Sequence, residues 1–374
     1  DKKEEKRKKR KIKGTEVKGK VTMLTHFKEK YIGSASFYKR YLCLALPMIL
    51  QNAITNLVSF LDNIMVGQLG TEPMSGVAIV NQLIFVYNLA IFGAVSAASI
   101  FGAQYFGKGN HKGHMHSFRF KLYASLTMTA ATILLFITKG STLISLYLTD
   151  TTGSGATEAA LQYGLEYLAI MMIGLIPFAI NQSYATNIKE TGQTMIPMIA
   201  SFAAVGLNAV LDYILIFGLG PIPKMGVVGA ALATVIARYI EALIVIVWAH
   251  TNRAKNRYLE GAYRGFGIPK AEFKAILIKG LPLMLNEVFW AAGMTTVTQC
   301  YSVRGLEVIA GLNIATTITN LFNIIYIQLG GCISIVVGQY LGAGKLKEAK
   351  DADNKMIVFS VFCCAIVAGV MLIF

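Results

Sequence analysis

The chain has 374 residues, of which 55% are hydrophobic and 15% are charged, and it carries a formal net charge of +15. Soluble globular proteins carry about 25% charged residues, so this composition excludes an ordinary soluble domain. The positive charge is concentrated in the first residues and in a few loops, which is typical of a membrane protein and argues against nucleic-acid binding. The sequence has no phosphate-binding loop of the Walker type, no nucleophile elbow and no zinc-protease motif. We therefore expect no enzyme activity and no bound cofactor.

Residues 1–40 are predicted to form a basic tail. The first 23 residues, DKKEEKRKKRKIKGTEVKGKVTM, contain no apolar run and therefore do not resemble a signal peptide. A solvated cytoplasmic tail is the default interpretation of such a charge run. A second interpretation is that Met23 is the true start and that the preceding residues are not native.

Apolar segments long enough to cross a bilayer follow the tail. Crossing requires about 20 mostly apolar residues in an α-helix. Nine segments meet that requirement, so we predict an all-α protein that crosses the membrane several times. The predicted spans are 41–66, 77–103, 121–147, 160–186, 196–218, 226–250, 275–301, 310–337 and 355–374.

The loops between these spans alternate in charge. Loops 104–121, 251–274 and 342–355 are rich in lysine and arginine. The alternate loops, on the other side of the membrane, contain only two such residues, Lys224 and Arg304. Basic loops remain on the cytoplasmic side of a membrane. We therefore predict a multi-pass protein of the plasma membrane whose N-terminus is cytoplasmic.

An internal repeat is visible at a constant offset of 235 residues. Pro47 falls on Pro282, and QYFGKG at 104–109 recurs as QYLGAG at 339–344. One period contains six predicted spans, an even number, so both copies have the same orientation. Parallel repeats related by an axis along the membrane normal are typical of transporters.

The repeat predicts two six-helix lobes related by a pseudo-two-fold axis, with the second lobe incomplete. At the same offset the last residue falls inside the third span of the first copy, so we expect a fragment or a truncated form. The predicted units are the tail at 1–40, an N-terminal lobe at 41–250, a cytoplasmic linker at 251–274 and a partial C-terminal lobe of three helices at 275–374.

The first span contains an acid, Asp62, as well as Pro47. An ionisable residue at membrane depth is costly and normally faces an ion, a cavity or a partner, unless Asp62 lies too near the helix end to matter. The fifth span offers partners, because Asn208 and Asp212 are four residues apart on one helical face and at similar depth. Two carboxylates and an amide can hold Na⁺ or share a proton. The alternative is that Asn208 and Asp212 only bond across helices.

Several segments together resemble the multidrug and toxic compound extrusion (MATE) family over about residues 40–374. They are DNIMVGQLG after the proline-containing first span, the repeated QYFGKG and QYLGAG, PFAINQSYATNIKETGQTMIPM, and VGLNAVLDYILIFG followed by GVVGAALAT. The resemblance implies twelve helices in two lobes, a central cleft, and cation-coupled export of amphipathic, often cationic, drugs.

The resemblance also implies roles for individual residues. The cation or proton site would consist of Asp62, Asn208, Asp212 and, by a looser alignment, Thr234. Pro47 resembles a first-helix proline that bends when this site is protonated, and Pro282 is its counterpart in the second copy. A static kink is the alternative for both.

Other polar residues lie within the predicted spans. Glu287 resembles a coupling glutamate of the C-terminal lobe in some family members, although it lies about one turn closer to the proline. The alternative role for Glu287 is to line the cleft. The residues expected to line the cleft at equivalent depths are Gln51, Asn52 and Asn286. Arg238 and Glu241 are predicted to neutralise each other. HKGHMH at 111–116 is predicted to be a solvated loop rather than a metal site.

Three functions are consistent with these features. The first is an H⁺- or Na⁺-coupled antiporter that exports drugs or toxic amphipathic cations by alternating access. The second is a flippase for lipid-linked saccharides of the same superfamily, which would have a cationic central cavity. The third is a truncated membrane protein that does not transport. The expected partners are the lipid bilayer and small amphipathic molecules, and we expect a monomer.

Overall fold

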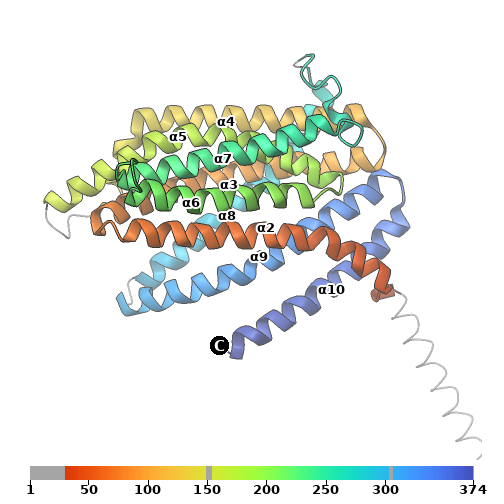
Figure 1. Cartoon of the computed structure of the whole chain (residues 1–374). Coiled ribbons are helices and arrows are strands. Elements are labelled where there is room, and N and C mark those ends of the chain that lie inside the picture. The colour runs from red at the N-terminus through yellow and green to blue at the C-terminus, as the bar shows by residue number, and fades with distance from the viewer. Residues whose placement is uncertain (1–29, 149–153, 266, 303–305, 374) are drawn as a thin grey trace, which may run out of the picture.

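The computed structural model describes residues 30–148, 154–265, 267–302 and 306–373, which form a bundle of long α-helices (Figure 1). The helices are α2 (Ala35–Gly67), α3 (Thr71–Gly107), α4 (His111–Ser145), α5 (Ser154–Glu190), α6 (Met195–Phe217), α7 (Gly226–Thr251), α8 (Lys270–Ser302), α9 (Leu306–Gly342) and α10 (Leu346–Ile373). The nine predicted spans correspond in order to α2 to α10. Within the described residues, eight helices are long and apolar enough to cross a membrane.

The predicted loop at 104–121 is wrong. Helix α3 continues to Gly107 and α4 begins at His111, so that only three residues connect them. Asn110 caps α4, because its side-chain oxygen accepts a hydrogen bond from the backbone N–H of Gly113 at 3.0 Å. The prediction excluded the polar start of α4 from the span because its hydropathy is low. Hydropathy does not show whether a polar side chain has a partner inside the protein.

Two other predicted boundaries also shift at this end of the bundle. Helix α2 begins at Ala35, inside the segment predicted to be a tail. The linker between α7 and α8 comprises residues 252–269, because α8 begins at Lys270 rather than at 275. In both places, amphipathic residues extend a helix beyond the apolar segment.

The turns that follow α3 and α9 have the same backbone geometry. Gly109 has a φ of +72° and Gly344 a φ of +75°, a left-handed conformation that favours glycine. In each turn the residue after the glycine donates its N–H to the carbonyl of a tyrosine, Tyr105 at 2.9 Å or Tyr340 at 3.0 Å. The structure therefore repeats at the offset of 235 residues seen in the sequence.

The apolar core of α2 to α7 lies mainly between α3, α5 and α7. Val80, Ile91 and Leu175 are completely buried there. Glycine allows the backbones to approach closely, as a Cβ atom on Gly76 would lie 2.5 Å from the carbonyl oxygen of Ala160. Small residues at helix contacts are typical of membrane proteins, whose helices associate by close packing.

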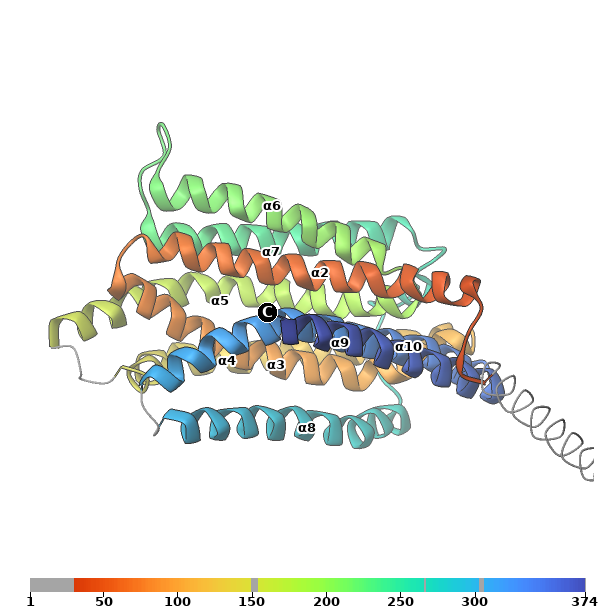
Figure 2. The same ribbon diagram turned by 90° about the horizontal axis from the view of Figure 1, so that it is seen from below.

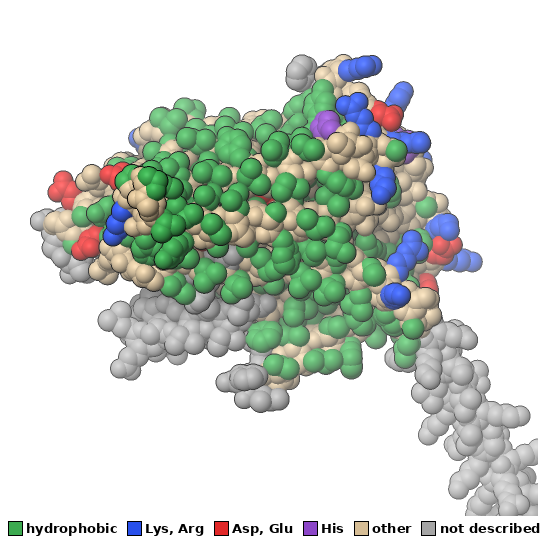
Figure 3. Space-filling view, viewed as in Figure 1, with side chains coloured by type: hydrophobic (Ala, Val, Ile, Leu, Met, Phe, Trp, Pro, Cys, Tyr) green, Lys and Arg blue, Asp and Glu red, His purple; other side chains and the backbone are tan. Residues whose placement is uncertain are grey.

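The outer surface is apolar between two polar ends (Figure 3). Lysine and arginine side chains gather at the end that contains the α3–α4 turn, the 252–269 linker and the α9–α10 turn (Figure 3). We refer to this end as the basic end. Seen from below, α8 lies at the edge of the bundle opposite α6 (Figure 2). An apolar belt with charged ends is the surface of a multi-pass membrane protein.

The linker is held in place by a buried arginine of α4. Arg119 donates from Nε to the carbonyl of Ala262 at 2.9 Å, from Nη1 to Gly267 at 2.8 Å and from Nη2 to Gly261 at 2.8 Å. Next to these residues, the short 3-10 helix η2 (Arg257–Leu259) buries two of its three side chains. Arg119 was predicted to be one of the basic residues of a cytoplasmic loop, but it is 7% exposed and organises the linker.

Replacing Arg119 with lysine is expected to loosen residues 258–265. Lysine keeps the charge but lacks the planar fork that reaches three carbonyls at once. Loss of even one hydrogen bond to a charged donor costs about 1.5 to 3 kcal/mol, so amide hydrogen exchange in this segment should accelerate roughly tenfold to a hundredfold. The exposed Arg257→Lys is the matched control, and equal exchange in both variants would contradict the assigned role of Arg119.

Candidate functional site

Asp62 and Asp212 meet where α2 packs against α6. Their carboxyl groups are close enough for a hydrogen bond when one of them carries a proton, and the side chain of Asn208 lies next to Asp212. Asp212 is 1% exposed and Asn208 is 5% exposed. The structure thus brings together three of the four residues predicted to form a cation or proton site.

The carboxylate oxygens of this cluster have spare hydrogen-bonding capacity. Among the residues that the structure describes, Oδ1 of Asp62 and both carboxylate oxygens of Asp212 are buried and have no hydrogen-bond partner. Buried polar atoms normally have partners. Oxygen ligands of this kind suit a hard cation, and a carboxyl pair can equally hold one proton. Among the described residues, no group of three His, Cys, Asp or Glu side chains could hold a metal ion.

The sequence analysis missed Tyr167, which lies near the acids, and its hydrogen-bond partner Asn81. Tyr167 of α5 is 5% exposed and is close to both Asp62 and Asp212. Its hydroxyl donates to Oδ1 of Asn81 of α3 at 3.3 Å. Both residues carry a polar group within an apolar predicted span, and this pattern could have identified them from the sequence. With them, α2, α3, α5 and α6 all contribute polar groups to this part of the bundle.

Arg238 and Glu241 do not form the predicted direct ion pair among the residues that the structure describes, although their charges still attract each other. Arg238 donates to the carbonyl of Gly174 at 3.4 Å and its guanidinium lies over the ring of Phe178, 5.3 Å from the centroid. Glu241 instead accepts a hydrogen bond from the hydroxyl of Ser201. A spacing of three residues allows contact but does not require it, and here the arginine side chain turns toward α5.

The remaining predicted N-terminal site residues make other contacts. Thr234 donates to the Ala230 carbonyl of its own helix at 3.0 Å, so its hydroxyl proton is not directed at the acids. Gln51 donates to Ser201 of α6 at 2.8 Å. Asn52 donates to the Met48 carbonyl within α2 at 3.1 Å. Their roles in a cation site or a cleft stay predictions.

The predicted hinge and C-terminal residues lie on α2 and α8. Pro47 is buried within α2, whereas Pro282 is exposed within α8. Asn286 is also exposed. The side chain of Glu287 lies outside the described residues. Its proposed coupling role therefore stays a prediction.

Comparison with known proteins identifies the family. The family model described as MatE matches residues 47–214 and 282–374, together more than half of the chain. This chain belongs to the MATE family. The two matched segments begin at Pro47 and Pro282, which are the two prolines related by the internal repeat.

Individual relatives match most of the MATE chain. Probable multidrug resistance protein NorM of Thermotoga maritima is 26% identical over 341 residues, which are 90% of this chain and 70% of that protein. The protein of the same name from Oceanobacillus iheyensis is 27% identical over 335 residues, 89% of this chain and 73% of that one. A multidrug resistance MATE family transporter solved in an outward-facing conformation shares the fold, with a TM-score of 0.78 at 23% identity over 92% of this chain and 75% of that one.

A second polar cluster of the MATE chain lies at the basic end. Lys121 of α4 is completely buried and bonds to both Glu190 and Asn187 of α5. His114 also bonds to Glu190, at 3.2 Å. Gln339 of α9 donates to the backbone carbonyl of Glu190 at 2.7 Å, which connects this cluster to the second repeat.

This cluster corrects the prediction that HKGHMH is a solvated loop. The segment is the first turn and a half of α4, and His114 is 1% exposed. His116 contacts Glu272 of α8 at 2.8 Å. His114 and His116 therefore hold helices together at the basic end.

The two repeats of the MATE chain touch each other at equivalent positions. A Cβ atom on Gly107 of α3 would overlap the carbonyl oxygen of Gln339 of α9. A Cβ atom on Gly342 of α9 would overlap the carbonyl oxygen of Gln104 of α3. Each repeat thus presents a glycine to the glutamine backbone of the other, and α3 and α9 meet with no side chain between them.

Proposed function

We propose that this protein exports amphipathic organic cations in exchange for H⁺ or Na⁺ by alternating access. The observation that carries the proposal is the pair of Asp62 and Asp212, in which three of the four carboxylate oxygens are buried and have no hydrogen-bond partner among the described residues. Membership of the MATE family and similarity to proteins named multidrug resistance proteins support a drug-extrusion transporter. The basic end would face the cytoplasm, because basic segments remain on that side of the membrane.

The acid pair lies at a position where ion binding can change helix packing. Two ionised carboxylates repel each other, and a proton or Na⁺ between them removes that repulsion. Helix α2 contacts α6 at two levels, through Asp62 with Asp212 and through Gln51 with Ser201. Pro47 lies roughly 22 Å along α2 from Asp62 and weakens the helix there. Ion occupancy would therefore shift α2 against α6 and bias one of two conformations.

Neutralising the acids is expected to abolish ion-dependent export. The full-length protein would be reconstituted into liposomes, and efflux of a fluorescent amphipathic cation would be driven by an imposed H⁺ or Na⁺ gradient. Asp62→Asn and Asp212→Asn should each remove the response to the gradient because they remove the charge that binds the ion. Unchanged gradient-driven efflux in both variants would refute the site.

A matched control tests whether any loss of carboxylate has this effect. Asp351 of α10 is half exposed and forms an ion pair with Lys355 at 2.6 Å. Asp351→Asn removes one carboxylate without touching the acid pair and should leave efflux as it is. Comparing the two gradients in the unmodified protein then identifies the coupling ion.

One observation favours a second candidate, the flipping of lipid-linked saccharides. Arg238 forms no direct ion pair with Glu241, so the N-terminal lobe contains an arginine without an ion pair among the described residues. An unpaired arginine can hold a phosphate. Scrambling of a labelled lipid-linked saccharide that is lost in Arg238→Gln, with no gradient-driven efflux of cations, would support this candidate over the antiporter.

A further inference from the structure

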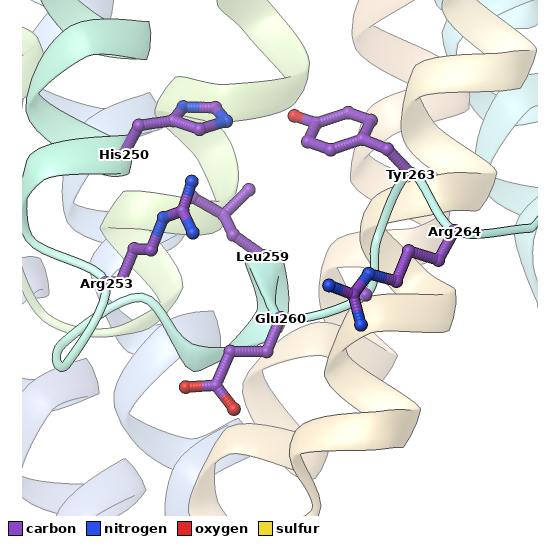
Figure 4. A pocket seen from close by; sticks show the side chains of 7 residues that line it. His250, Arg253, Leu259, Glu260, Tyr263 and Arg264 are labelled. Atoms are coloured by element: carbon purple, nitrogen blue, oxygen red, sulfur yellow. The ribbon is translucent and has the colours of Figure 1, made fainter.

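A pocket of about 480 Å³ lies at the basic end, between the end of α7 and the linker that joins the two repeats (Figure 4). Arg253 and Arg264 approach its interior from opposite walls, with Glu260 below them, and His250 faces Tyr263 across the top (Figure 4). The volume is in the range of small-molecule sites. The acid pair lies near the C-terminal ends of α2 and α6, away from the basic end, so the pocket has no part in the proposed ion coupling.

The walls of the pocket are fixed rather than loose. Arg119 binds the carbonyls of Gly261 and Ala262 on one side. Tyr263 is held by a hydrogen bond between its hydroxyl and that of Tyr184, and its ring is parallel to that of His250 at 5.9 Å between centroids. Burial raises the pKa of Tyr263, so the phenol stays neutral and adds no negative charge. A surface linker with this many contacts is preorganised for a ligand.

The charges of the pocket favour an anion. Its lining contains two arginines and one carboxylate, that of Glu260. Neither arginine has an ion-pair partner among the residues that the structure describes. Arginine presents a planar fork of donors that matches phosphate oxygens. The chemical group that fits two convergent guanidinium groups is therefore a phosphate ester.

The position of the pocket indicates where the phosphate comes from. Helix α7 has 26 residues, or about 39 Å, and the hydrocarbon core of a bilayer is about 30 Å thick. Its last turn, which contains His250, therefore lies at the level of lipid headgroups. Leu243 and Val247 are on the same face of α7 as His250 and are 56% and 50% exposed. They provide an apolar path for an acyl chain that leads to the pocket.

We propose that Arg253 and Arg264 bind the phosphate of an anionic phospholipid whose acyl chain lies along Leu243 and Val247. Because the linker 252–269 connects the two repeats, a bound headgroup would also restrict the motion of one repeat relative to the other. The pocket is thus a lipid-binding site at which membrane composition can act on the protein.

The test uses the full chain, purified in a neutral detergent and titrated with phosphatidylglycerol, phosphatidylcholine or inorganic phosphate. Bound lipid is counted by native mass spectrometry. Phosphatidylglycerol should bind in preference to phosphatidylcholine. The double variant Arg253→Ala with Arg264→Ala should weaken phosphatidylglycerol binding roughly tenfold or more. Glu260→Gln should strengthen it, because it removes the one carboxylate of the lining.

The matched control is Lys255→Ala with Arg257→Ala, which removes the same charge from exposed residues of the same linker outside the pocket lining. This double variant should retain most of the binding. Equal loss in both double variants would overturn the proposal, since a generally basic surface would then suffice. Equal binding of both lipids, or a site filled by inorganic phosphate in competition with the lipid at equal concentration, would overturn it as well.

Discussion

Replacing Lys121 with methionine is expected to destabilise the protein by about 3–5 kcal/mol. The ammonium group of Lys121 is completely buried and bonds to Glu190, which is 1% exposed. Methionine fills a similar volume but leaves the carboxylate of Glu190 buried with one cationic partner fewer. His114 remains at 3.2 Å and can replace part of the lost interaction only by binding a proton. Unfolding by dodecyl sulfate in dodecylmaltoside micelles would measure the change.

Two further variants separate charge burial from packing. Glu190→Gln added to Lys121→Met removes the unpaired charge and should recover most of the stability. Lys345→Met breaks an exposed pair, in which Lys345 and Glu348 are 56% and 55% exposed, and should cost less than about 1 kcal/mol. If the double variant were less stable than Lys121→Met alone, the unpaired carboxylate would not be the cause.

Gly107→Ala and Gly342→Ala are each expected to force α3 and α9 apart at the basic end. The added Cβ would overlap a backbone carbonyl of the opposite helix, which no rotamer change can move away. Overpacking of this kind costs about 1–3 kcal/mol. Because the two contacts are equivalent, the two variants should cost similar amounts in the same unfolding assay. Spin labels at Lys108 and Lys347, in a background without the five native cysteines, should also report a longer distance.

The control for these glycine variants is Gly206→Ala in α6. A Cβ atom on Gly206 meets nothing within 4 Å. Alanine is favoured over glycine inside a helix by about 1 kcal/mol, so this variant should be neutral or stabilising. If Gly107→Ala behaved like Gly206→Ala and the label distance did not change, α3 and α9 would not be in backbone contact.

The helices could be predicted because a membrane span is a simple function of apolar length. The repeat could also be predicted, since glycines such as Gly109 and Gly344 are fixed by the left-handed turns they form. The proximity of Asp62 to Asp212 followed from their matched depth on α2 and α6, which run in the same direction. In each case the prediction depends only on the length of an apolar segment or on the spacing of residues, and both can be determined from the sequence without tertiary contacts.

The polar contacts at the basic end could not be predicted in this way. Lys121 and Arg119 were predicted to lie in an exposed basic loop. Their partners, Glu190 and the carbonyls of the linker, are distant in sequence. Arg238 was matched to its neighbour Glu241, although its side chain reaches Gly174 on another helix. Hydropathy and local spacing do not contain the tertiary contacts that decide whether a charged residue is exposed.

The contact between α3 and α9 has a consequence for how such a chain arose. Gly107 meets Gln339 and Gly342 meets Gln104, so each side presents the same pair of residues to the other. This is an isologous interface, the type found in two-fold homodimers. A chain that contained only the first repeat would carry both halves of the contact and could pair with a second copy of itself. The fused protein therefore retains, within one polypeptide, the interface of a symmetric dimer.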